Sequence, residues 1–237
     1  DHTLDLNRLC ESWRRTLRRR NESDAKLRAW CCTGTAAWLW KSYPYELSLL
    51  NLEESQEIDP PGTLLPEINL GIRGISVRPI AVSHCTADRA AWNPKNPVPC
   101  SAAFVIQAEK KAVLLWDIDN ANDWLDKPST PEHRMAVQAL SKPDYLFVDC
   151  NTWKEESPGG KNTGHASFQT VKKYAAALNL KPTSETLLMH LSGHEDGRGN
   201  PGWGWDDRRW ETEAKAEWAT PGLSGSVRVP EIGEEFW

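Results

Sequence analysis

The chain has 237 residues, of which 39% are hydrophobic and 26% are charged, and its formal net charge at pH 7 is −5. This composition is typical of a globular domain, and the length suits a single domain covering residues 1–237. It argues against a disordered chain and against a nucleic-acid-binding protein with a basic surface throughout. No apolar run approaches the roughly eighteen residues that a membrane helix needs, so we expect no membrane partner.

The six cysteines are scattered, and none of them forms a CxxC pair. A chain of this length builds its own core, so a disulfide framework or a structural zinc knuckle is not expected and the cytoplasm is the favoured compartment. The chain also opens on Asp1-His2, where an initiator methionine would stand.

The first half begins with an amphipathic helix that ends near Asn21. Leu6, Leu9, Trp13 and Leu17 recur at helical spacing, with arginines concentrated behind them. A solvated face is the favoured reading of those arginines, although they could meet a phosphate-bearing ligand. The other predictions are a strand at 29–33, a helix stopping before Pro44, an acidic loop at 51–66, strands at 68–70 and 75–82, an irregular segment at 86–99, and a hairpin of strands 101–108 and 111–116.

In the second half, helices alternate with short buried strands. The predicted helices are 121–125, 131–140 and 168–178, and the predicted strands are 145–148 and 186–189. Strands early and mixed β-α units later indicate an α/β domain in which helices cover the faces of a sheet.

Candidate metal ligands stand at the ends of three predicted strands. His84 follows 75–82, Asp117 follows Trp116, and His190 follows 186–189. One such residue is often just a polar side chain leaving the core, but three of them, with Asp1-His2 leading into a helix, favour a shared metal site. Imidazole nitrogens with carboxylate oxygens suit zinc, and would also accept manganese or iron.

These residues carry a family resemblance. Asp1-His2 before a helix, followed by Val82-Ser83-His84, Leu114-Leu115-Trp116-Asp117 and Leu188-Met189-His190, resembles the metallo-β-lactamase fold, whose hallmark is HxHxDH and then His, Asp and His at later strand ends. The stretches 144–150, 164–168 and 190–196 resemble the phosphoribosyl cyclic phosphodiesterase of the carbon–phosphorus lyase pathway. The resemblance implies a four-layer αββα fold that lacks its first strands here.

The resemblance also implies a site with two divalent metal ions, zinc before manganese or iron. Asp1, His2 and His190 correspond to ligands of one metal, Asp117 bridges, and His84 corresponds to a ligand of the other. The two histidines that precede Asp1 in the family motif are absent, which suggests that the natural protein continues upstream.

On the same resemblance, the chain would be a hydrolase in which a hydroxide shared by the metals attacks a small phosphodiester. Asp1 would bind metal and orient that hydroxide, and His165 would donate a proton to the leaving alkoxide. His194 is expected to support a ligand or face the substrate, and His133 to be structural. For Asp149 and Cys150, hydrogen bonding near the site and a purely structural role are both kept.

The role of three tryptophans stays open. Trp203, Trp205 and Trp210 could stack on a base or sugar, but packing is the favoured role.

The alternatives to a phosphodiesterase are lactone or ester hydrolysis, cleavage of RNA as in tRNA-processing endonucleases, and a degenerate non-catalytic binding module. RNA is the weaker partner because the chain is acidic, and a homodimer is left open.

Overall fold

A computed structural model describes residues 6–20, 25–55, 60–84, 101–154, 165–191, 202 and 204–236. Contacts divide the chain into two compact units. Unit 1 is Asp1–Ile58 with Asp88–Cys100, and unit 2 is Asp59–Ala87 with Ser101–Trp237. The expectation of a single domain stays a prediction.

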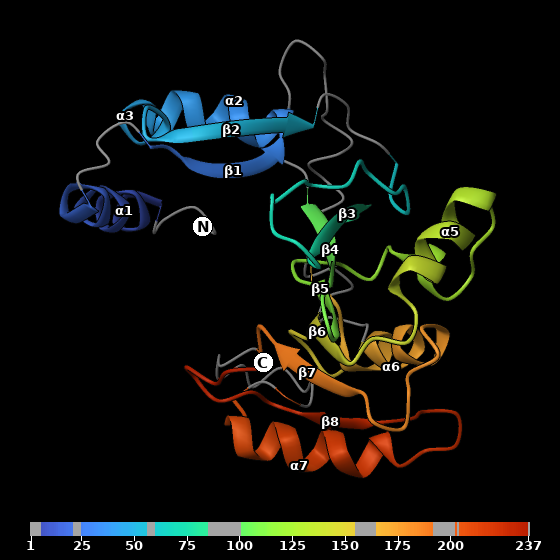
Figure 1. Ribbon diagram of the computed structural model, residues 1–237. Coiled ribbons are helices and arrows are strands. Elements are labelled where there is room, and N and C mark those ends of the chain that lie inside the picture. The colour runs from blue at the N-terminus through green and yellow to red at the C-terminus, as the bar shows by residue number, and fades with distance from the viewer. Residues whose placement is uncertain are drawn as a thin grey trace. The chain divides into compact units, whose positions relative to one another are not determined.

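Unit 1 is a small α/β unit. In chain order it contains α1 (Leu6–Arg20), β1 (Leu27–Cys32), α2 (Thr33–Ser42), α3 (Pro44–Leu47) and β2 (Leu50–Ser55) (Figure 1). The first helix is confirmed, and it buries Cys10 and Leu17 while the predicted core residue Leu9 is exposed. Its arginine-rich end, Arg18 to Arg20, is exposed as expected for a solvated face.

The strand β2 corrects one prediction, because it lies at the start of the segment expected to be an acidic loop. Leu50 is buried in the small core, and β2 pairs with β1 in parallel from Leu27↔Leu50 onward. The acidic Glu53 is accommodated because Arg28 on β1 forms an ion pair with it. The charge of Glu53, which favoured a loop in the sequence, is therefore neutralised by a side chain on the neighbouring strand.

Unit 2 is built on a six-stranded sheet with the order β3-β4-β5-β6-β7-β8. The strands are β3 (Ser76–Val82), β4 (Ser101–Gln107), β5 (Lys111–Leu115), β6 (Tyr145–Asp149), β7 (Glu185–Met189) and β8 (Ser226–Arg228). The first three pair antiparallel, and β5 to β8 pair in parallel. The predicted hairpin and the two buried strands are confirmed, whereas residues 68–70 contribute only an isolated bridge between Ile68 and Val77.

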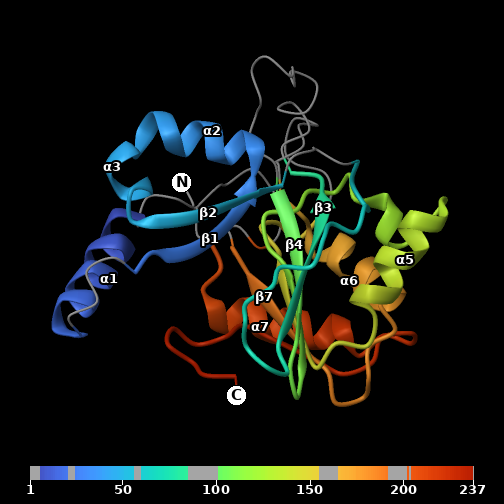
Figure 2. The ribbon, with the colours of Figure 1, turned by 45° about the horizontal axis from the view of Figure 1, so that its top comes forward.

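The helices of unit 2 are η1 (Asp123–Leu125), α5 (Pro131–Leu140), α6 (Phe168–Ala177) and α7 (Asp207–Trp218). Residues 121–125 were expected to be a helix, and only a single 3₁₀ turn forms there. The Ser167 side chain caps α6 by accepting a hydrogen bond from Thr170 N. Figures 1 and 2 show α5 and α6 on the same side of the sheet, where they share one core with α7. None of the described helices is long and apolar enough to cross a bilayer.

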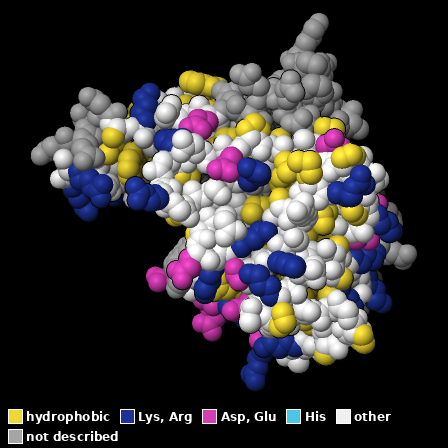
Figure 3. All heavy atoms as spheres, turned by 45° about the vertical axis from the view of Figure 1, so that its right-hand side comes forward, with side chains coloured by type: hydrophobic (Ala, Val, Ile, Leu, Met, Phe, Trp, Pro, Cys, Tyr) yellow, Lys and Arg dark blue, Asp and Glu magenta, His cyan; other side chains and the backbone are white. Residues whose placement is uncertain are grey.

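The face of the molecule turned forward in Figure 3 has Lys and Arg side chains dispersed among uncharged ones, with acidic side chains between them. Basic side chains do not gather into one continuous stripe on this face.

Asp144 precedes β6 and forms hydrogen bonds at the amino ends of the parallel strands. Its carboxylate accepts hydrogen bonds from Lys181 Nζ at 2.6 Å and from Lys111 N at 2.8 Å, and the bond from Lys181 is the larger cause of the lowered pKa of Asp144. Because the folded pKa lies below the unfolded value, the stabilisation is complete above about pH 5 and is lost as the pH falls through the folded pKa.

We expect Asp144→Asn to lower the free energy of unfolding by about 1 kcal/mol or less at pH 7, since both partners are partly exposed. Urea unfolding at pH 7 and at pH 3 checks this expectation. The difference between wild type and variant should shrink at pH 3, and an equal difference at the two pH values would contradict the account.

Candidate metal centre

Three acidic or imidazole side chains meet at the carboxyl edge of the parallel strands. Asp117 lies two residues beyond β5, Asp149 is the last residue of β6, and His190 follows β7 directly. Because β5, β6 and β7 are parallel neighbours, their carboxyl ends lie at the same edge of the sheet. His165, two residues before the cap of α6, joins them, and one potential ligand atom from each of the four residues lies within 4.8 Å of the others.

His84 borders this cluster from the end of β3. Its ring centroid lies 4.9 Å from that of His165, and the His165 ring lies 4.2 Å from that of His190 in an edge-to-face arrangement. The structure therefore brings together His84, Asp117, His165 and His190, all of which the sequence singled out. Asp1, His2 and His194 lie outside the described residues.

Asp149 and His165 form the closest pair of the cluster. His165 Nδ1 lies 2.7 Å from Asp149 Oδ2, and the Asp149 side chain is fully buried. This contact fixes the orientation of the imidazole. Of the two roles kept for Asp149, the structure places it in hydrogen-bonding contact with the site.

The second oxygen of Asp149 matches what a metal ion needs. Oδ1 is buried and has no hydrogen-bond partner among the described residues. A buried carboxylate oxygen without a donor costs free energy, and a bound cation would remove that cost. A donor set of carboxylates and imidazoles also suits zinc, manganese or iron, so these residues fit a divalent metal.

His190 lies between the two carboxylates. Its Nδ1 is 3.8 Å from Asp117 Oδ1 and 3.8 Å from Asp149 Oδ2. The interaction with the Asp149 carboxylate is the main cause that raises the pKa of His190, burial opposes this effect, and the negative charge of Asp117 adds to it. The same negative potential favours any cation at this edge of the sheet.

The backbone is strained at two residues of the cluster. Asp117 has φ 49° and His190 has φ 59°, which is the left-handed region that non-glycine residues seldom adopt. Asn151 supports one of them, because its Nδ2 donates to the His190 carbonyl at 3.1 Å. Such strain costs about 1 kcal/mol or more per residue and concentrates at functional sites.

The other residues singled out in the sequence have structural surroundings. Cys150 is fully buried, which raises the pKa of its thiol and makes it a poor nucleophile. Trp210 is fully buried and, like Trp205, packs against Trp153 in an aromatic cluster. His133 packs on Trp124 in the α5 region, in agreement with the structural role expected for it. Trp203 lies outside the described residues.

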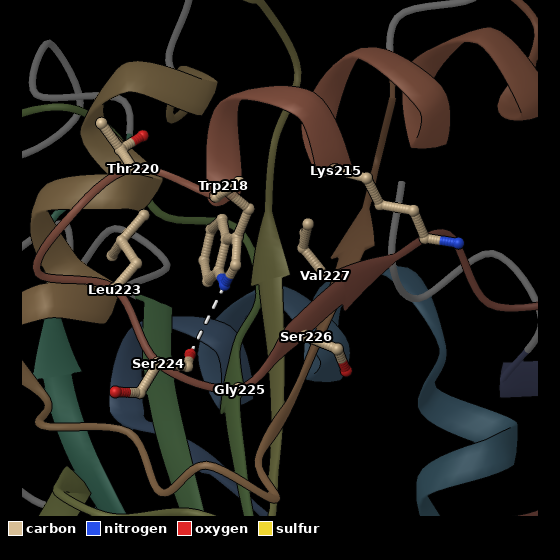
Figure 4. Close-up of a pocket in the computed structure, with 9 residues that line it drawn as sticks. Lys215, Trp218, Thr220, Leu223, Ser224, Gly225, Ser226 and Val227 are labelled. Atoms are coloured by element: carbon tan, nitrogen blue, oxygen red, sulfur yellow. Dashed lines mark hydrogen bonds between the residues drawn. The ribbon is translucent and has the colours of Figure 1, made fainter.

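A separate hollow of about 430 Å³ lies beside α7 and β8 (Figure 4). The Trp218 indole forms one wall of it and donates from Nε1 to the Ser224 carbonyl at 3.4 Å. Ser226 in its lining is in register with Glu185, the first residue of β7. The hollow therefore lies at the amino ends of the strands, and the acidic and imidazole cluster lies at their carboxyl ends.

No protein-family model matches the chain, and no curated protein sequence is significantly similar to it. Solved structures do match. The metallo-beta-lactamase fold protein YhfI from Bacillus subtilis aligns at a TM-score of 0.58 and 16% identity over 97% of this chain and 71% of its own. A structure described as a new diphosphatase from the PhnP family aligns at a TM-score of 0.50 and 13% identity over 87% of this chain and 56% of its own.

The chain thus has the metallo-β-lactamase fold, as the family resemblance of its sequence implied. Sequence identities of 16% and 13% are evidence for a shared fold alone.

Proposed function

We propose that this chain is a metal-dependent hydrolase that cleaves a bond to phosphorus, most simply in a small phosphodiester. The observation that carries the proposal is the convergence of Asp117, Asp149, His165 and His190 at one edge of the sheet. The fold supports it, since the structurally similar proteins include a diphosphatase.

Asp117, Asp149, His190 and His84 are the described residues of unit 2 that would hold metal. Divalent ions bound there would supply Lewis-acid chemistry, which makes water nucleophilic near neutral pH and neutralises charge on phosphoryl oxygens. The chain's contribution is to hold carboxylates and imidazoles from separate strands at fixed positions, so that little reorganisation accompanies binding.

His165 is the proposed proton donor to the leaving oxygen. Asp149 holds the Nδ1 side of the ring at 2.7 Å, and Nε2 is the ring nitrogen proposed for that transfer. Asp149 would serve both the imidazole through Oδ2 and a metal through Oδ1.

The substrate class can be narrowed by the leaving group. A phosphodiester releases an alkoxide, which needs a proton, whereas a diphosphate releases a phosphate, which is a far better leaving group. Because His165, held by the buried Asp149 carboxylate, is the proposed source of that proton, the phosphodiester is the first candidate and the diphosphate the second.

Metal removal and reloading tests this proposal. We expect the chelator-treated 237-residue chain to be inactive and to regain hydrolysis of bis(p-nitrophenyl) phosphate on addition of Zn²⁺ or Mn²⁺. A diphosphate ester and a lactone are assayed as alternative substrates. Turnover of the lactone alone would favour an ester hydrolase, and metal binding without turnover of any substrate would favour a non-catalytic binding module.

A further inference from the structure

A buried polar network lies next to two residues of the proposed metal centre, His84 and Asp117. It consists of Ser83, Asp119 and Asn122, which are 2%, 0% and 0% exposed. Ser83 immediately precedes His84, and Asp119 stands two residues after Asp117. Polar side chains this deeply buried cost free energy unless every hydrogen bond is made, so their arrangement needs a reason.

The backbone N, the carbonyl oxygen and the hydroxyl of Ser83 all form hydrogen bonds with Asp119 or Asn122. Ser83 N donates to Asn122 Oδ1 at 2.7 Å, and Ser83 Oγ donates to Asp119 Oδ2 at 3.0 Å. The Ser83 carbonyl accepts from Asn122 Nδ2 at 2.8 Å and from Asp119 N at 3.0 Å. The residue before His84 is therefore fixed to the loop that follows Asp117 by four hydrogen bonds.

The sheet alone does not determine the separation of His84 and Asp117. They follow β3 and β5, which are not neighbours, because β4 lies between them. Both residues stand beyond the ends of their strands, where the ladder of hydrogen bonds has stopped. The bonds between Ser83, Asp119 and Asn122 span this gap directly.

The same network supports the strained backbone of Asp117. Asn122 Nδ2 also donates to the Asp119 carbonyl at 3.0 Å, and Asp119 Oδ1 accepts from Ala121 N at 2.9 Å. These bonds fix the turn that follows Asp117, whose φ of 49° is unfavourable for a residue with a side chain. A conformation of this kind persists only where its surroundings over-determine it.

We propose that Ser83, Asp119 and Asn122 are positioning residues that set the places of His84 and Asp117 and thereby the affinity of the centre for metal. The inference rests on the proposed metal-dependent function. Residues that orient metal ligands without touching the metal typically change its affinity by about 10- to 100-fold when they are replaced. None of the three signalled this role in the sequence, because the contacts between Ser83 and the residues 36 and 39 positions later form only in the folded chain.

The chain offers a matched control for the test. Ser184 is as deeply buried as Ser83, at 1% exposed, and its hydroxyl also makes internal hydrogen bonds, to the Pro143 carbonyl at 2.5 Å and from Lys181 N at 2.9 Å. It precedes β7 and therefore lies at the amino ends of the strands, away from the centre. Ser83→Ala and Ser184→Ala remove the same hydroxyl from equally buried sites.

The experiment compares the Zn²⁺ dissociation constant of both variants, by competition with a chromophoric chelator, and the Tm of the metal-free proteins. We expect both variants to have a lowered Tm, and Ser83→Ala alone to raise the dissociation constant by about 10-fold or more. Asp119→Asn, which keeps the size of the side chain, should raise it as well.

Equal dissociation constants in Ser83→Ala and wild type, or equal shifts in the two serine variants, would overturn the positioning role while leaving the proposed function intact. A wild-type chain that binds no Zn²⁺ would instead overturn the proposed function, and the positioning role with it.

Discussion

Replacing His190 with alanine is expected to weaken Zn²⁺ binding by at least about 100-fold, because a direct ligand matters more than the partners that orient it. His190 has its Nδ1 3.8 Å from carboxylate oxygens of both Asp117 and Asp149, so its loss opens the middle of the cluster. Hydrolysis should fall to background with it. Calorimetric titration of the metal-free variant with Zn²⁺ measures the first effect, and a phosphodiesterase assay measures the second.

His133→Ala provides the control, since it removes the same kind of side chain from a site where the imidazole packs on Trp124. We expect that variant to lose some stability and to keep the wild-type affinity for Zn²⁺. Unchanged Zn²⁺ affinity in His190→Ala would remove His190 from the centre.

Replacing His165 with glutamine is expected to lower kcat by about 10²- to 10⁴-fold for a phosphodiester with an alkoxide leaving group, the range typical of a lost general acid. The effect should be much smaller for a p-nitrophenolate leaving group, which departs without a proton. Glutamine keeps a hydrogen-bonding group near Asp149 Oδ2, so the buried carboxylate is not left without a donor. Steady-state kinetics on the two substrates measure the contrast.

The Zn²⁺ content of His165→Gln distinguishes the proton donor from a ligand, because His165 also lies within 4.8 Å of the other potential ligands. Retained metal with a leaving-group-dependent loss of kcat supports the proton donor. Loss of metal, or an equal loss of kcat on both substrates, would contradict that role.

The sequence predicted the part of the centre that depends on strand ends. The apolar runs before Asp117 and His190 form β5 and β7, and the parallel pairing of these strands with β6 brings their ends to one edge. His84 follows β3 in the same way. Hydrophobic patterning carries this information, because a short apolar run bounded by polar residues predicts both a buried strand and the point where it ends.

The sequence could not predict the features that depend on tertiary contacts. The left-handed backbone at Asp117 and His190 has no glycine to signal it, and the contact of Asp149 with His165 joins residues 16 positions apart. The strand β2 was missed because its acidic residues resemble a loop until Arg28 pairs with Glu53. Helix α7 and strand β8 follow the last element predicted from the sequence and were not predicted.

We propose that side chains from separate strand ends form one metal centre in unit 2. An X-ray crystal structure of the Zn²⁺-loaded chain, with anomalous difference maps recorded on both sides of the zinc absorption edge, would locate the bound ion. The account predicts a zinc peak at about 2.0–2.2 Å from oxygen and nitrogen atoms of Asp117 and His190. Zinc bound elsewhere on the chain, with Asp117, Asp149 and His190 left without a peak, would contradict it.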